Sequence, residues 1–126
     1  RIQNDLFDLG ADLCTPEGAI PRKNRLRMST EQITRLESEC AELNKDLPAL
    51  SSFILPGGSA AAAHLHHART AVRGAERLMT KLAQDEEVNE AALRYVNRLS
   101  DHLFVLARAL NDRGKGDVLW VPGKNR

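Results

Sequence analysis

The sequence has 126 residues and a formal net charge of +1, with 42% hydrophobic and 28% charged residues. These values are ordinary for a globular chain that buries its own core, so we expect a single domain over residues 1–126. A net charge near zero gives no bulk attraction to nucleic acid or to a membrane surface. Aromatic residues, at 4%, are too scarce for a base-stacking surface. We therefore expect neither nucleic acid nor a membrane among the partners.

The cysteines and the hydropathy pattern bear on the compartment. Cys14 and Cys40 lack the spacing of metal ligands. We expect two buried thiols in a reducing compartment rather than a disulfide. No apolar run has the length that spans a bilayer, and no secretory signal is visible. The expected compartment is the cytoplasm.

The first third of the chain predicts two helices joined by a loop. Apolar residues recur at helical spacing over residues 1–13. Because no initiating Met and no N-cap precede them, we expect a missing N-terminal segment. Residues 14–27 carry two prolines and a glycine and predict a loop. Ser29 and Gln32 then match a capping box, and the helix behind it is expected to run as far as Pro48.

The remainder predicts two longer helices and an extended tail. Residues 51–58 end in Pro-Gly-Gly and predict a turn. Ser59 is a good N-cap for a helix that an alanine run begins. A polar break follows at residues 84–89, then an apolar seam from Leu93 to Leu110 predicts the last helix, and residues 117–122 an extended tail. With no strand pair visible, the fold class is all-α, a helical bundle with short connections.

The third helix carries the most informative cluster of charges. Arg69, Arg73, Glu76 and Arg77, here named the arginine face, fall with His66 on one third of the helix circumference. Guanidinium groups gathered around a single carboxylate suit a polyanion such as a triphosphate. The alternative is a charged face that is simply solvated.

Several other residues are candidates for a functional role. Asn97 is a poor helix former in mid-helix, and Asp101, Phe104 and Arg108 follow it on one stripe. The alternative is a solvent-facing stripe, or an Asn bonded to a neighbouring helix. Phe53 precedes the Pro-Gly-Gly turn, and the alternative there is a plug on the end of the core.

A metal site is the weakest candidate. His64 and His67 are three residues apart and could share a metal ion, but no carboxylate or Cys stands at a matching spacing. We therefore expect no protein-bound metal site.

Four ordered blocks of sequence carry a family resemblance. They are Phe53-Ile54-Leu55-Pro56-Gly57-Gly58-Ser59, His66-His67-Ala68-Arg69-Thr70, Arg73-Gly74-Ala75-Glu76-Arg77, and residues 95–108. Together they resemble the PduO-type ATP:corrinoid adenosyltransferases. The opening residues 2–13 and the closing Asp117-Val118-Leu119-Trp120 look like the same family, so the resemblance covers nearly the whole chain.

The resemblance implies an assembly and an activity. The family folds as a five-helix bundle and forms a homotrimer with its active sites at the subunit interfaces. It moves the 5′-deoxyadenosyl group of ATP, with Mg²⁺, to the cobalt of reduced cobalamin, giving adenosylcobalamin and triphosphate. A cobalamin reductase and an adenosylcobalamin-dependent enzyme are the further partners that this activity implies.

The resemblance also implies residue roles. Those that would bind ATP or order its site are Arg69, Arg73, Glu76, Arg77 and Asn97. Phe53 would lie against the corrin and keep the lower face of cobalt free, so that Phe53 and Arg69 would take part in catalysis. Ser100 and Asp101 would support the site.

Two departures from the family pattern keep another class open. A Gly- and Thr-rich phosphate segment, and a helix with an acidic partner for Arg69, do not occur in the sequence. The expectation is that the N-terminal ATP-loop segment is missing from the given chain. Gly74 stands where the family commonly has a second adjacent Arg, which would weaken nucleotide affinity. The alternative is a non-catalytic helical module that carries cobalamin or binds a partner.

Overall fold

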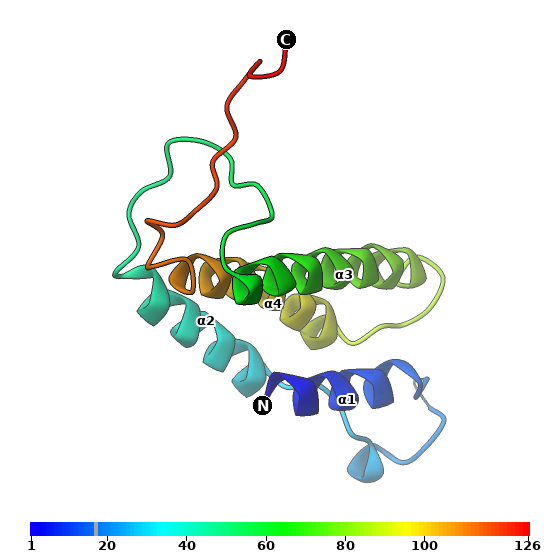
Figure 1. The fold of residues 1–126 in the computed structure, drawn as a ribbon. Helices are drawn as coiled ribbons and strands as arrows, with labels where there is room; N and C mark the ends of the chain where they lie inside the picture. The colour runs from blue at the N-terminus through cyan, green and yellow to red at the C-terminus, as the bar shows by residue number, and fades with distance from the viewer. Residues whose placement is uncertain (17) are drawn as a thin grey trace.

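The computed structural model describes residues 1–16 and 18–126. Its four α-helices are α1 (Ile2–Leu13), α2 (Thr30–Asn44), α3 (Ala60–Leu82) and α4 (Glu90–Ala109), with a short 3-10 turn η1 (Arg22–Asn24) between α1 and α2. α4 is the central helix, because it packs along α3 and α2 and also contacts α1 (Figure 1). The described residues contain no strand, so the expected all-α class is confirmed.

The capping residues explain where the helices begin. Ser29 and Gln32 form the predicted capping box, in which the Ser29 backbone N–H donates to Gln32 Oε1 at 3.0 Å. Ser59 Oγ accepts from the Ala62 backbone N–H at 3.1 Å at the start of α3. α2 ends at Asn44, earlier than the end at Pro48 that the sequence predicts. The reason is that proline disfavours helical backbone in the residue before it, so the helix unwinds ahead of that proline.

The core lies between α2 and α4, with α3 packed on its side. Its largest fully buried side chains are Tyr95, Ile33, Leu36, Leu99 and Val96. Removing these side chains from water is the main favourable term that holds the helices together. The expectation of two buried thiols is wrong for Cys14, which is exposed, whereas Cys40 is half-buried. Both cysteines are free, and burial raises the pKa of the Cys40 thiol to about 11, so this thiol stays protonated near neutral pH.

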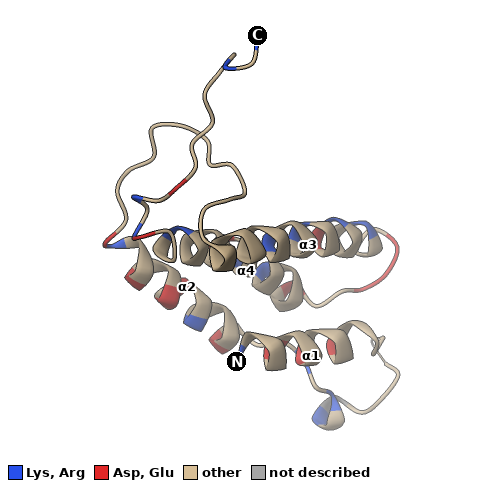
Figure 2. Ribbon diagram, viewed as in Figure 1, with Lys and Arg blue, Asp and Glu red and all other residues tan. Residues whose placement is uncertain are grey.

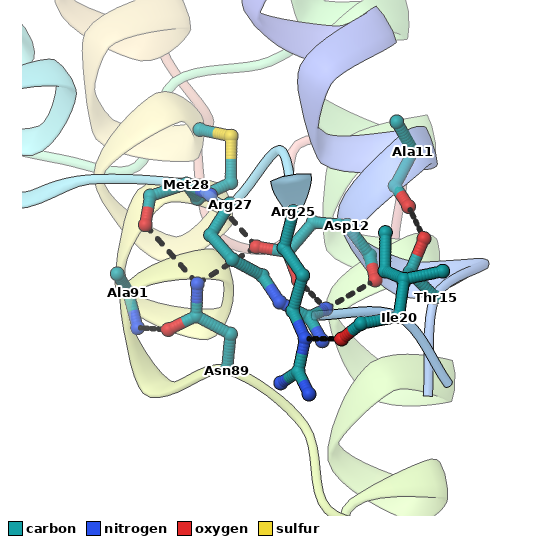
Figure 3. A network of polar contacts seen from close by, with 9 residues as sticks. All are labelled: Ala11, Asp12, Thr15, Ile20, Arg25, Arg27, Met28, Asn89 and Ala91. Carbon is teal, nitrogen blue, oxygen red and sulfur yellow. Dashed lines mark hydrogen bonds and ion pairs between the residues drawn. The ribbon is translucent and has the colours of Figure 1, made fainter. Parts of the chain in front are cut away.

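A buried carboxylate ties the lower end of the bundle together (Figure 3). Asp12 of α1 is 2% exposed and accepts from the Met28 backbone N–H and from Asn89 Nδ2, both at 2.7 Å. Arg27 forms an ion pair with the other carboxylate oxygen at 2.6 Å. Asn89 also caps α4, because its Oδ1 accepts from the Ala91 backbone N–H at 3.0 Å. This network joins the end of α1, the segment before α2 and the start of α4.

At the opposite end of α4, the residues that precede α3 run beside the C-terminal tail (Figure 1). The sequence predicts an extended tail and no strand pair. The structure adds one isolated antiparallel bridge between Ile54 and Leu119. Its backbone hydrogen bonds run from Leu55 N–H to Val118 O at 2.7 Å and from Trp120 N–H to Phe53 O at 2.8 Å. Residues so distant in sequence gave no strand pattern of their own, so only the fold could reveal this pairing.

Candidate functional site

α3 presents the predicted charges along one side. Its charged residues are Arg69, Arg73, Arg77 and Lys81, with Glu76 as the only acid (Figure 2). Arg73 forms an ion pair with Glu76 one turn away, and its side chain remains 45% exposed. Arg77 is exposed and forms no ion pair within the described residues. The arginine face therefore offers two accessible guanidinium groups, which suits the binding of a solvated polyanion.

Asn97 of α4 is bonded to the arginine face. Its Nδ2 donates to Glu76 Oε1 at 2.8 Å, and its Oδ1 accepts from Arg98 at 2.7 Å. Arg98 in turn lies 3.3 Å from Asp101. Of the readings left open by the sequence, the Asn bonded to a neighbouring helix describes the structure. Arg73, Glu76 and Asn97 thus form one polar chain across the contact between α3 and α4.

Ser100 lies one turn beyond Asn97 on α4. It is 3% exposed, and its hydroxyl donates to the Asn97 carbonyl at 2.8 Å. An open groove of about 410 Å³ runs beside Asn97, lined by Glu37, Glu76, Leu93, Arg94, Asn97 and Arg98. The polar chain therefore borders a space that a ligand can enter.

Arg69 lies on a different part of the same face. Its guanidinium carbon is 5.4 Å from the centroid of the Phe104 ring, which is a cation–π contact. The buried His66 meets the same ring edge-on, with centroids 6.3 Å apart. Burial, and then the charge of Arg69, lowers the pKa of His66 below its ordinary value, so the fold favours the neutral imidazole. Among the described residues, Arg69 Nε and His66 Nε2 are buried without a hydrogen-bond partner.

Phe53 is not a plug on the core. Its side chain is 77% exposed, and its ring packs on Trp120 with centroids 5.9 Å apart and planes inclined by 57°. No contact joins Phe53 to the arginine face among the contacts of the described residues. α3 begins after Phe53, and Arg69 follows ten residues after Ser59, which is about 15 Å along the helix. One chain therefore presents two separate halves of the predicted site.

Two other expectations resolve differently. Arg108, placed on the Asn97 stripe by its spacing, is buried at the far end of α4, where it bonds Asp117 and Pro48. A buried Arg that binds a buried carboxylate and a backbone carbonyl is a structural residue and leaves the candidate site. His64 and His67 are exposed, and the described residues contain no group of three or more metal-ligating side chains. Trp120, the neighbour of Phe53, is not among the residues that the sequence singled out. The one signal for it in the sequence is that it is the single Trp of the chain.

Comparison with known proteins supplies a family. Residues 1–110 match the family model described as cobalamin adenosyltransferase. The corrinoid adenosyltransferase of Mycobacterium tuberculosis is 52% identical over 128 residues, covering 100% of this chain and 65% of that protein. The corrinoid adenosyltransferase of Bacillus subtilis is 43% identical, covering 93% of this chain and 59% of that protein. The chain thus spans about two thirds or less of the length of these relatives.

A solved structure agrees with the sequence comparison. A variant of the PduO-type ATP:corrinoid adenosyltransferase from Lactobacillus reuteri, complexed with cobalamin and ATP, superposes with a TM-score of 0.85 at 38% identity. The match covers 96% of this chain and 65% of that one. A match to the family model over most of the chain, together with relatives at this identity, leaves one conclusion. The chain belongs to the cobalamin adenosyltransferase family.

Proposed function

We propose that the protein containing this chain transfers the 5′-deoxyadenosyl group of ATP to the cobalt of reduced cobalamin. The products are adenosylcobalamin and triphosphate. The observation that carries the proposal is the accessible pair of guanidinium groups, Arg73 and Arg77, on the same face as the Glu76–Asn97 hydrogen bond. Family membership and the ATP and cobalamin bound by the Lactobacillus reuteri relative support the same reading.

The chemistry asks the protein for position and electrostatics. Cobalt(I) is itself a nucleophile: its electron pair forms the bond to C5′ while the bond from C5′ to the phosphate oxygen breaks. The electron pair of that bond leaves with the triphosphate. Arg73 and Arg77 stabilise the negative charge that grows on the departing group, and Arg69 acts beside them. No Ser or Cys nucleophile is required.

Asn97, Glu76 and Phe53 have separate tasks in this proposal. Asn97 and Glu76 orient the arginine side chains and line the nucleotide site, supported by Ser100 and Asp101. Phe53 presents an exposed ring that would lie against the corrin and keep water and a lower ligand away from cobalt. Removing that ligand makes cobalt(II) easier to reduce to the reactive cobalt(I).

Mg²⁺ is proposed to accompany ATP. The described residues contain no group of three or more carboxylate, His or Cys side chains around a common point. The phosphates of the nucleotide, together with water, would supply most of the ligands of Mg²⁺, as is usual for this ion.

The complete protein is proposed to be a five-helix bundle that assembles as a homotrimer. The two halves of the site lie apart on one chain, so an interface that places Phe53 of one subunit near the arginine face of another would complete it. Large exposed apolar side chains support such an interface, since Phe7 is 83% and Leu78 71% exposed.

None of the helices described has the length and apolar character needed to cross a bilayer. We place the enzyme in the cytoplasm, served by a cobalamin reductase and supplying an adenosylcobalamin-dependent enzyme.

The test is direct. Full-length protein is mixed with ATP and chemically reduced cobalamin, and adenosylcobalamin and triphosphate are quantified together. Equal amounts of both products support the proposal. Bound cobalamin without either product would instead identify the alternative, a non-catalytic helical module that carries cobalamin or binds a partner.

A further inference from the structure

A buried polar cluster lies where α4 ends, beyond the arginine face. Its members are Arg108, Asn111 and Asp117, here named the α4 end cluster. Arg108 is 5% and Asn111 3% exposed, and the side chain of Asp117 is 3% exposed. We infer that this cluster, and Asn111 above all, positions Phe53 for its contact with the corrin. The inference rests on the proposed function and adds positioning residues to it.

Asn111 holds the segment that follows Phe53. Its Nδ2 donates to the Gly57 carbonyl at 3.1 Å, and its Oδ1 accepts from the Ser59 backbone N–H at 2.8 Å. The two bonds straddle Gly58, whose φ is +99° and where a Cβ would lie 2.3 Å from Asn111 Oδ1. Only glycine fits this conformation and this close approach. The side-chain amide of Asn111 therefore fixes the backbone between Phe53 and α3.

Arg108 holds the segment that precedes Phe53. Its guanidinium donates to the Pro48 carbonyl at 2.7 Å and to Asp117 Oδ2 at 2.9 Å. Pro48 lies at one end of the segment around Phe53 and Gly57 at the other, so the last turn of α4 and the residue just after its C-cap hold the two ends. Asp117 begins the C-terminal tail, so the tail is attached to the same cluster.

The tail then reaches the Phe53 residue itself. Trp120 N–H donates to the Phe53 carbonyl at 2.8 Å, and Ser52 Oγ donates to the Trp120 carbonyl at 2.7 Å. Because the Phe53 ring is 77% exposed, packing against the core does not fix its place. Its position follows from the backbone of the loop and the tail, and the α4 end cluster anchors both.

The chemistry of the cluster favours positioning over simple stabilisation. A buried ion pair such as Arg108–Asp117 loses much of its Coulomb energy to desolvation, and apolar side chains of the same volume commonly stabilise a fold as well. Hydrogen bonds are directional, so a hydrogen-bonded polar cluster restricts the geometry of the backbone groups that it binds. Here the bonded carbonyls and N–H groups belong to the segments on either side of Phe53.

The experiment compares the two asparagines that flank α4, Asn89 before it and Asn111 after it. Asn111→Ala removes the anchor of the Phe53 segment. Asn89→Ala, the matched control, removes the half-buried asparagine that caps the other end of the helix, where its Nδ2 donates to Asp12 and to the Met28 carbonyl (Figure 3). The two sites are about 33 Å apart along the axis of α4. Both variants lose a capping or bridging amide, so both are expected to lower the free energy of unfolding.

Two measurements separate the roles. In the protein without ligands, acrylamide quenching of Trp120, the only Trp of the sequence, reports the pairing of tail and loop. With ATP and cob(II)alamin bound, the fraction of four-coordinate cobalt reports the placement of Phe53. Asn111→Ala should raise quenching and reduce the four-coordinate fraction by about fivefold or more. A fivefold change in an equilibrium corresponds to a free-energy change of about 1 kcal/mol. Asn89→Ala should change both by less than about twofold, and the KM for ATP should stay near wild type in both variants.

The outcomes are distinguishable. Wild-type quenching and a wild-type four-coordinate fraction in Asn111→Ala overturn the inference, and so do equal changes in both variants. If Asn111→Ala does not fold, Asp117→Asn takes its place. It keeps the size of the side chain but removes the negative charge from the bond to Arg108, and a change of about fivefold is expected because hydrogen bonds to charged groups are the stronger kind. If wild-type protein forms no adenosylcobalamin, the proposed function fails, and the quenching comparison still decides whether Asn111 holds the loop to the tail.

Discussion

Asn97 on α4 donates a 2.8 Å hydrogen bond to Oε1 of Glu76 on α3, while Oε2 of Glu76 pairs with Arg73. One carboxylate thus couples a guanidinium of the arginine face to the central helix. Without Asn97, Glu76 would lose its only partner on another helix among the described residues. The geometry of the arginine face therefore depends on a residue that lies outside it.

Replacing Asn97 by Ala should test this coupling. We expect the free energy of unfolding to fall by about 1 kcal/mol, because a partly buried carboxylate oxygen loses its donor. The KM for ATP should rise at the same time, since Glu76 and Arg73 lose their fixed orientation. Urea denaturation and steady-state kinetics measure the two effects. Asn44→Ala, at an exposed position of α2, is the control and should change neither.

The arginine face gives the second prediction. Arg73→Ala and Arg77→Ala should each weaken ATP binding by about 2 kcal/mol, the usual worth of a charge-assisted hydrogen bond to a phosphate. The helical circular dichroism should not change, because both side chains are exposed. Lys81→Ala, one turn beyond Arg77 on the same helix, is the matched loss of a positive charge. If Lys81→Ala weakens ATP binding as much as the arginine variants do, general charge and not the arginine face explains the affinity.

Phe53 gives the third prediction. Phe53→Ala should change the free energy of unfolding by no more than about 0.5 kcal/mol, because the ring is mostly exposed. Turnover that starts from cobalt(II) should fall more than about tenfold, which is 1.4 kcal/mol in activation free energy. Turnover from cobalt(I) should suffer less, and the KM for ATP should hardly move. Leu50→Ala, in the same loop, should leave all four quantities near wild type. Equal losses from cobalt(II) and cobalt(I) would contradict a role in exposing cobalt.

His66 predicts a specific pH dependence. Burial lowers its pKa in the folded protein, so below its ordinary pKa of about 6.5 the unfolded chain binds more protons than the folded one. The stability associated with neutral His66 is therefore complete above that pH and is lost as the pH falls toward the lowered pKa. His66→Gln should flatten the decline in the free energy of unfolding between pH 7.5 and pH 5. His64→Gln, at an exposed position, should leave the decline unchanged.

Assembly gives the last prediction. Sedimentation equilibrium of the complete protein at micromolar concentration should report three chains per particle. The reason is that Phe53 and the arginine face do not meet within one chain. Mixing a Phe53→Ala protein with an Arg73→Ala protein should then restore part of the activity, because some interfaces combine an intact half from each. A fully active monomer would rule out a site shared between subunits.

The local features of the fold could be predicted from side chains that are close together in the chain. The spacing of apolar residues and the capping residues Ser29 and Ser59 located the helices, because helix formation depends on side chains within one or two turns of each other. For the same reason, helical spacing alone placed Arg69, Arg73, Glu76 and Arg77 on one face. The family blocks could also be read in order along the chain.

Which distant residues meet depends on the tertiary structure and could not be predicted from local sequence patterns. Arg108 shares a helical stripe with Asn97, yet its partners are Pro48 and Asp117, and no local pattern distinguishes the two fates. The exposure of Phe53 and the bonds from Asn111 to Gly57 and Ser59 likewise arise where the loop, the tail and the end of α4 come together. The bonds from Asn111 and the bond from Arg108 to Pro48 join residues about 50 or more positions apart, so they follow from the packing of the helices and not from the periodicity of any one of them.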